Sequence, residues 1–128
     1  MRVFLLGAFL ALGVMSQPTS LAAKEKAAKA SGSPARALAS WYGVSHQGRL
    51  TASGVKFDRN RLTAAHRLYP FGTLLRLTNV QNRRQVVVQI NDRGPYRRGR
   101  SLDLSEAAAR RLGIIERGFA WVSVTPAE

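Results

Sequence analysis

The segment Thr73–Asp92, with the sequence TLLRLTNVQNRRQVVVQIND, decides the fold class of this chain. Apolar side chains occupy every second position in both of its halves: Leu75 and Leu77, then Val86, Val88 and Ile90. This period of two is typical of a strand with one buried face. The polar triplet 81–83 between the halves has the length of a hairpin connection. The segment therefore predicts an antiparallel pair of strands, 73–80 and 84–91.

Two further strands and one helix flank this hairpin. We expect strands at 38–43, LASWYG, and at 119–125, FAWVSVT, where β-formers and alternation recur. A short helix is predicted over Glu106–Leu112, because Ser105 is a good N-cap, alanines fill the interior and Gly113 is a typical stop.

Short strands with one short helix within about 90 residues favour a small β-barrel over a doubly wound sheet. The predicted domain spans residues 38–126. We expect its core to contain alternating side chains of three strands: Leu75, Leu77, Val86, Val88, Ile90, Val122 and Val124.

Residues 1–22 predict export. Arg2 is followed by the apolar run Val3–Met15, thirteen residues without a charge, and small side chains surround Ala22. This pattern is typical of a cleavable signal peptide, and the apolar run is shorter than the ~20 residues of a membrane-spanning helix. An uncleaved N-terminal anchor is the alternative. Because the 128 residues include no cysteine, we expect neither a lipoprotein nor disulfides. The expected location is periplasmic or secreted, without a stable membrane anchor after signal cleavage.

The charge balance favours an anionic partner. The chain has 20 Lys and Arg residues against 7 Asp and Glu residues, a formal net charge of +13. Residues 23–37 are expected to form a basic low-complexity linker, because they lack aromatic residues that would anchor a core. Export argues against a nucleic-acid partner, which leaves anionic membranes and acidic wall polymers.

Three aspartates are candidates for chemistry. Asp92 follows an apolar strand and precedes a Gly-Pro pair, so a rigid scaffold holds its carboxylate at a loop mouth. The alternative is an aspartate that only bonds its own turn. Asp103 is either a second carboxylate or, the favoured interpretation, a structural residue near the helix start. Asp58 is expected in a surface turn, with substrate contact as the alternative.

His66, Trp41 and Tyr42 are the remaining candidates. A single histidine such as His66 is more often a hydrogen-bonded structural group, and the alternative is a contact with substrate or with Asp92. Trp41 and Tyr42 are adjacent in a strand, so one of them faces outward, where an aromatic ring stacks on sugars. No residue set indicates a metal site or an organic cofactor.

Six ordered motifs resemble those of the rare lipoprotein A (RlpA-like) family: ASWYG at 39–43, GRLTASG at 48–54, LTAAH at 62–66, PFGT at 70–73, NDRGP at 91–95 and DLS at 103–105. The resemblance covers about residues 38–124. It implies a six-stranded double-psi β-barrel with one short α-helix, related to expansins and barwin. It also implies an envelope protein that acts on peptidoglycan, with Asp92 at the position of the catalytic aspartate.

The better-studied members of this family are lytic transglycosylases that prefer glycan strands without stem peptides. The resemblance implies the same endolytic reaction, which leaves 1,6-anhydro-muramic ends. We expect a monomer that binds peptidoglycan strands, with Asp92 as the catalytic residue. The expected substrate-binding residues are Trp41, Tyr42, Asp58, His66, Arg93 and Asp103.

One departure from the family pattern concerns Val55, which stands where the family frequently has a glutamate of the active site. Hydrolysing glycosidases usually need two carboxylates. A lytic transglycosylase instead uses the 6-hydroxyl of its own substrate, so that one carboxyl group serves first as acid and then as base. Asp92 alone meets this requirement in the first hypothesis. The second hypothesis is a non-catalytic, expansin-like module that binds wall polysaccharide.

Overall fold

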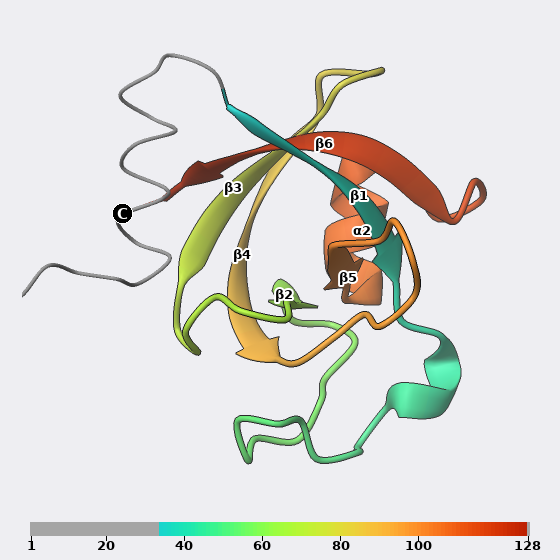
Figure 1. Cartoon of the computed structure of the whole chain (residues 1–128). Helices are drawn as coiled ribbons and strands as arrows, with labels where there is room; N and C mark the ends of the chain where they lie inside the picture. Colours follow the sequence, from blue (N-terminus) through green and yellow to red (C-terminus); the bar gives the residue numbers. More distant parts are fainter. Residues whose placement is uncertain (1–33, 128) are drawn as a thin grey trace, which may run out of the picture.

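The computed structural model describes residues 34–127, which fold into a closed barrel of six strands with one α-helix (Figure 1). The strands are β1 (Ala35–Trp41), β2 (Thr63–Ala65), β3 (Leu74–Asn79), β4 (Gln85–Asp92), β5 (Leu102–Leu104) and β6 (Phe119–Pro126). The helical segments are the 3₁₀ turn η1 (Val44–His46) and the helix α2 (Glu106–Leu112). The predicted class, a mainly-β barrel with one short helix, is confirmed.

The strand order around the barrel is β1-β5-β2-β4-β3-β6, and β6 closes it by pairing with both β1 and β3. The β1–β5 and β2–β4 pairs are parallel, and the other four pairs are antiparallel. The predicted hairpin is confirmed, because Leu75 lies opposite Val88 and Leu77 lies opposite Val86. Its connection spans residues 80–84, which is longer than the predicted triplet.

Two features of the strands differ from the predictions. β1 begins at Ala35 and ends at Trp41, whereas the sequence predicted a strand at 38–43. Pairing causes the early start, because Ala35 has a partner in Val124 of β6. The barrel therefore includes the last residues of the predicted linker. β2 and β5 were not predicted as strands, since three residues are too few to show a period of two.

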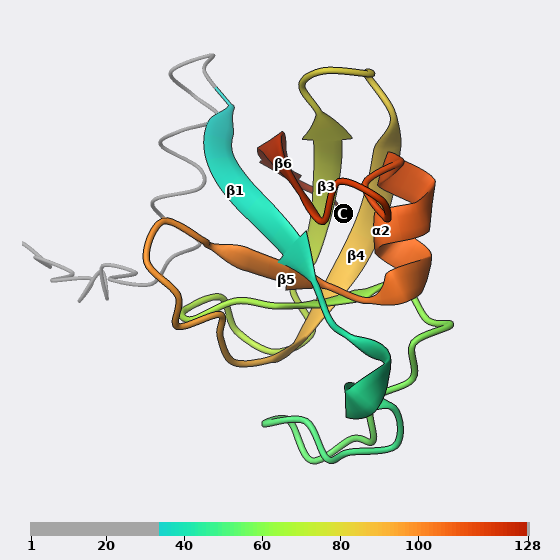
Figure 2. The same ribbon diagram turned by 90° about the vertical axis from the view of Figure 1, so that its right-hand side faces the viewer.

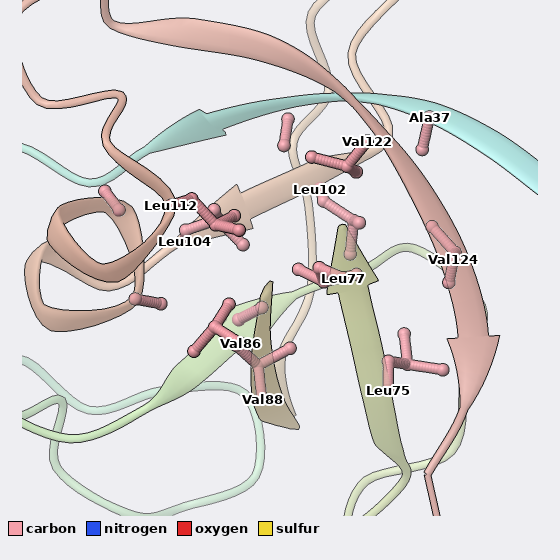
Figure 3. Close-up of a cluster of buried hydrophobic side chains, with 14 of the residues drawn as sticks. Ala37, Leu75, Leu77, Val86, Val88, Leu102, Leu104, Leu112, Val122 and Val124 are labelled. Carbon is pink, nitrogen blue, oxygen red and sulfur yellow. The ribbon is translucent and has the colours of Figure 1, made fainter. Parts of the chain in front are cut away.

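Alternating side chains of the strands fill the barrel, as Figure 3 shows. All seven core residues predicted from the sequence are buried. Short strands and the helix complete the same cluster with Leu102, Leu104 and Leu112, each 1% exposed or less. The alternation of apolar and polar residues thus predicted the core residues of the long strands. The other core residues belong to segments too short to show such a pattern.

The helix α2 has the predicted bounds and the predicted caps. The Ser105 hydroxyl accepts a hydrogen bond from Ala108 N at 3.2 Å, as an N-cap does. Gly113 adopts a left-handed conformation with φ of 72° at the C-terminal end. This positive φ favours glycine, whereas the nearest atom to an added Cβ is the movable end of the Arg84 side chain. α2 packs beside β4 (Figure 2).

Two of the sequence predictions concern residues that are not described. The predicted signal peptide 1–22 and the linker up to residue 33 lie outside the described part of the chain. Between residues 34 and 127, no helix has the length and apolar character needed to span a membrane.

We predict that Leu77→Ala lowers the free energy of unfolding by about 2–5 kcal/mol, because it opens a cavity in a fully buried site. Arg76→Ala, on the exposed face of the same strand, is the matched control and should change stability by less than about 0.5 kcal/mol. Urea unfolding measures both. Equal losses for the two variants would contradict the assignment of the barrel core.

Candidate active site

Residues 42–62 form a cover segment that connects β1 to β2 outside the barrel. In both views this segment and η1 lie below the strands, next to the end of β4 (Figures 1 and 2). Ser53 N donates a hydrogen bond to Asn91 O at 3.3 Å, which ties the cover segment to β4. Tyr42, Phe57 and Ala65 form a small buried cluster separate from the barrel core. The cover segment thus creates a second packed region at this end of the barrel.

Asp92 is the last residue of β4, and three donors hold its carboxylate. The Tyr42 hydroxyl donates to Oδ2 at 2.6 Å. The backbone amides of Ala52 and Arg93 donate to Oδ1 at 2.9 and 2.8 Å. These donors come from the start of the cover segment, from its middle and from the loop after β4. The half-exposed carboxylate is therefore fixed in place by separate parts of the chain.

Tyr42 remains a hydrogen-bond donor at all ordinary pH values. Burial, followed by the hydrogen bond to Asp92 and the charges of Asp92 and Asp103, raises the pKa of this tyrosine well above its usual value. The ring is buried and packs against Phe57, with 4.7 Å between the ring centroids. Tyr42 therefore positions the aspartate, a role that the sequence alone did not indicate.

A register shift in β2 brings Asp92 level with Asp103. Ala64 lies opposite Ile90 of β4, whereas Ala65 lies opposite both Asp92 of β4 and Asp103 of β5. Without the shift, the residue directly after Ile90 would lie opposite Ala65. Because neighbouring strands are ~4.8 Å apart, the Cα atoms of the two aspartates are roughly 10 Å apart.

Asp103 occupies a less polar environment than Asp92. The Ser40 hydroxyl donates to its Oδ1 at 3.2 Å. Burial raises the pKa of Asp103 to about 6, and the nearby Asp92 charge acts in the same direction. Ser40, His46 and Arg100 act against this rise without cancelling it. Asp103 is thus an aspartate that exchanges its proton near neutral pH.

A pocket of about 360 Å³ opens beside Asp103. Its lining comes from the end of β1, η1, the loop after β4 and β5: Ser40, Trp41, Tyr42, Gly43, His46, Pro95, Tyr96, Arg97, Arg100 and Asp103. Three predicted site residues, Trp41, Tyr42 and Asp103, therefore share one pocket. Asp92 does not line the pocket, but it accepts a hydrogen bond from the hydroxyl of Tyr42, which does.

His66 and Arg93 hold the loop that follows β2. His66 Nδ1 accepts hydrogen bonds from Leu68 N and Tyr69 N, both at 3.0 Å. Burial, with the charges of Arg67 and Arg93, lowers the pKa of His66 to about 4. The ring is therefore neutral near pH 7, with Nδ1 free of a proton.

The Arg93 guanidinium contacts the loop that follows β2. Its Nη1 donates to His66 O at 3.3 Å and to Tyr69 O at 2.8 Å. The same group stacks 3.9 Å from the centroid of the Phe71 ring. Arg93 thus braces the loop with its side chain while its backbone amide holds Asp92. Neither Arg93 nor His66 lines the pocket.

Asp58 and Val55 belong to the cover segment but not to the pocket lining. Asp58 Oδ1 accepts a hydrogen bond from Asn60 N at 2.9 Å, which closes a local turn. Val55 is 51% exposed, and its carbonyl accepts hydrogen bonds from both the amide and the hydroxyl of Thr51. This short loop presents the Ala52 amide to Asp92.

Several pocket residues were not predicted from the sequence: Ser40, His46, Tyr96, Arg97 and Arg100. One signal for the last three was available, because four arginines and a tyrosine crowd between the two candidate aspartates at 92 and 103. Ser40 and His46 gave no such signal. Between residues 34 and 127, no three His, Asp or Glu side chains gather as a metal site would require.

Comparisons with known proteins place the chain in a family. A sequence profile of the family described as lytic transglycolase matches residues 34–124. The chain belongs to this family. A probable endolytic peptidoglycan transglycosylase RlpA of Aquifex aeolicus is 57% identical over 83 residues, which are 65% of this chain and 37% of that protein. The endolytic peptidoglycan transglycosylase RlpA of Neisseria meningitidis serogroup A is 44% identical over 86 residues, which are 67% of this chain and 36% of that protein.

These relatives confirm the predicted resemblance to the RlpA-like family. The chain spans about a third of the length of these two curated relatives. Among solved structures, the apo expansin of Clavibacter michiganensis is similar, with a TM-score of 0.56 and 26% identity over 73% of this chain and 50% of that chain. The Streptomyces papain inhibitor shares the fold, with a TM-score of 0.56 and 20% identity over 73% of this chain and 96% of that chain. The double-psi β-barrel is thereby confirmed.

We predict that Asp103→Asn gains stability relative to the wild type as the pH rises from about 4 to about 7. The pKa of Asp103 is about 6 in the folded protein and 3.8 in its ordinary environment. Between these values the folded state keeps a proton that the unfolded state has released, so rising pH destabilises the wild type. The variant cannot titrate at this position.

Urea unfolding of both proteins across this pH range measures the difference, in which all other titrations cancel. An NMR titration of the Asp103 carboxyl group gives an independent value. A constant difference between the two proteins at every pH would contradict the buried environment of Asp103.

Proposed function

We propose that this protein is an endolytic peptidoglycan lytic transglycosylase that acts outside the cytoplasm. The observation that carries the proposal is the placement of Asp92 and Asp103 on either side of Ala65, with an open pocket that Asp103 lines. Membership of the lytic transglycolase family supports the reaction type. The names of the RlpA relatives support peptidoglycan as the substrate.

The two carboxyl groups suit different halves of the reaction. Asp92 accepts hydrogen bonds in all three of its contacts, which fits a group that receives a proton. Asp103, with a pKa of about 6, is partly protonated near neutral pH and fits a proton donor. This pairing supports Asp103 as the acid and Asp92 as the base. The sequence alone had suggested that Asp92 serves as both.

In the proposed reaction the bond between C1 of muramic acid and the leaving O4 breaks. Asp103 donates its proton to O4, and the 6-hydroxyl oxygen of the same muramic acid forms the new bond to C1. Asp92 takes the proton of that hydroxyl. Asp92 then releases this proton to solvent, and solvent returns one to Asp103, which restores both carboxyl groups. The product end is a 1,6-anhydro sugar, and no water is consumed. Because the nucleophile belongs to the substrate, its effective concentration is high.

The remaining predicted roles are part of the same proposal. Trp41 and Tyr42 contribute apolar surface to the pocket, which suits a sugar face. His66 and Arg93 act through the loop that they brace, and Asp58 acts through the cover segment. We propose that the protein is a monomer in the periplasm or the secreted fraction, that it binds glycan strands lacking stem peptides, and that it uses no cofactor.

We predict that Asp92→Asn and Asp103→Asn each lower the cutting rate by about 10²–10⁴-fold, because an amide cannot transfer the proton. Glu116→Gln, at an exposed acid of the loop before β6, is the matched control and should keep the wild-type rate. The measurement incubates purified protein with stripped glycan strands and detects anhydro-muramic ends by mass spectrometry. Cutting by the wild type but equal cutting by Asp92→Asn would refute the assignment of the base.

The rate should also fall as the pH rises above about 6, because Asp103 then loses the proton that it donates. If Asp103→Asn keeps the full rate and an unchanged pH profile, Asp92 is both the acid and the base.

A non-catalytic wall-binding module is the second candidate function. Val55 favours it, because a valine replaces an acidic side chain beside the loop that holds Asp92. The structural likeness to an expansin is compatible with either candidate.

The variant Val55→Glu separates the two candidates. If the wild type is the enzyme, Val55→Glu should change its rate by less than about tenfold, since the acid and base are already present. If the wild type releases no anhydro-muramic ends and Val55→Glu gains them, the binding module is the correct function. Mass spectrometry of digests made in parallel gives the answer.

A further inference from the structure

The pocket beside Asp103 carries two arginines that form no ion pair within residues 34–127, although the Arg100 charge acts on Asp103 from a distance. Arg97 and Arg100 both line it, with Arg97 exposed and Arg100 half-buried. Within residues 34–127, both ion pairs involve Glu106, the first residue of α2, which pairs with Arg59 and Arg110. The Asp103 carboxyl in the same pocket is held by Ser40. The pocket therefore has guanidinium groups available for an anion from outside.

The same pocket offers surfaces for a sugar ring. Trp41 is half-buried against the barrel core, and Tyr96 is 78% exposed at the pocket rim. Aromatic rings of this kind present a flat apolar face next to a polar edge. Guanidinium groups match the two oxygens of a carboxylate with paired N–H donors. Together these residues fit a sugar that carries a carboxylate.

We propose that Arg97 and Arg100 bind the free lactyl carboxylate of a muramic acid unit, and that they thereby select strands without stem peptides. This inference rests on the proposed function, since it places a wall glycan in the pocket. In peptidoglycan the lactyl carboxylate is free only where no peptide is attached. A stem peptide converts it into a neutral amide, which offers a single acceptor oxygen and adds bulk at the pocket rim.

The position of the arginines supports a role in selection. They belong to the loop that begins directly after Asp92 and ends at β5, which carries Asp103. The loop is tied to other segments at both ends, since Ser101 N donates to Leu38 O at 3.0 Å and Arg93 Nη1 donates to Tyr69 O at 2.8 Å. A carboxylate bound by this loop therefore lies next to the reacting groups.

The decisive test compares two substrates that differ only in the lactyl group. Stripped glycan strands with free carboxylates are one substrate, and the same strands after conversion of these groups to methylamides are the other. We expect the purified wild type to bind the free-acid strands ~10-fold more tightly, as for a hydrogen-bonded charged group. Calorimetry gives the dissociation constants. Equal affinity for both strands overturns the proposal, whatever the variants do.

Variants then locate the effect. Arg97→Gln should abolish the preference, whereas Arg98→Gln should retain it, because Arg98 lies on the same loop but outside the pocket lining. This control also removes the general attraction between a basic protein and a polyanion, since both variants lose one charge. Arg100→Gln should also reduce the preference, but it additionally shifts the pKa of Asp103. A preference that survives in both Arg97→Gln and Arg100→Gln assigns the selection to other residues and overturns the proposal.

Failure of the proposed function gives a different pattern. If no strand is cut but the binding preference is present and depends on Arg97, the enzyme proposal fails and the carboxylate site stands. If free-acid and amidated strands are bound and cut equally well, the carboxylate site fails and the enzyme proposal stands.

Discussion

The site of this protein depends on one irregularity in the barrel, the register shift between Ala64 and Ala65 of β2. Side chains at positions 86, 88 and 90 of β4 point into the core, and a regular strand would send position 92 the same way. The shift instead brings Asp92 opposite Ala65, where Asp103 lies on the other side. Bulges are known to re-aim side chains near sites of chemistry. Here the shift follows Ile90, the last core residue of β4, and brings Asp92 level with Asp103.

The two acids differ because their neighbours differ. Asp92 lies where the start and the middle of the cover segment meet the loop after β4, and each of these places supplies a hydrogen-bond donor. Asp103 has a hydroxyl partner in Ser40, and burial raises its pKa to about 6. A carboxylate fixed by donors and a carboxyl that titrates near neutral pH form a useful pair for proton transfer. Val55 takes no part in this pair and does not line the pocket.

The arginines that make this chain strongly basic have different structural partners. Arg93 braces a loop through backbone carbonyls, and Arg59 and Arg110 neutralise Glu106. Arg97 and Arg100 instead line the pocket beside Asp103. A net charge of +13 indicates an anionic partner but does not say which arginines meet it. Only the local partners of each guanidinium separate structural arginines from those available to a ligand.

The sequence by itself determined the long strands, the helix and the core, because alternation, capping and turn residues are local signals. Leu75, Leu77, Val86, Val88 and Ile90 were identified in this way, and so was the helix Glu106–Leu112. The ordered motifs also identified the family and singled out Asp92. The tertiary structure decided the rest. The strands β2 and β5 are too short to show a period, and the partner of Asp92, Tyr42, lies fifty residues away in the chain. Whether Asp103 is structural or chemical depends on burial and on a register between strands, which are properties of the closed barrel and not of any segment of the sequence.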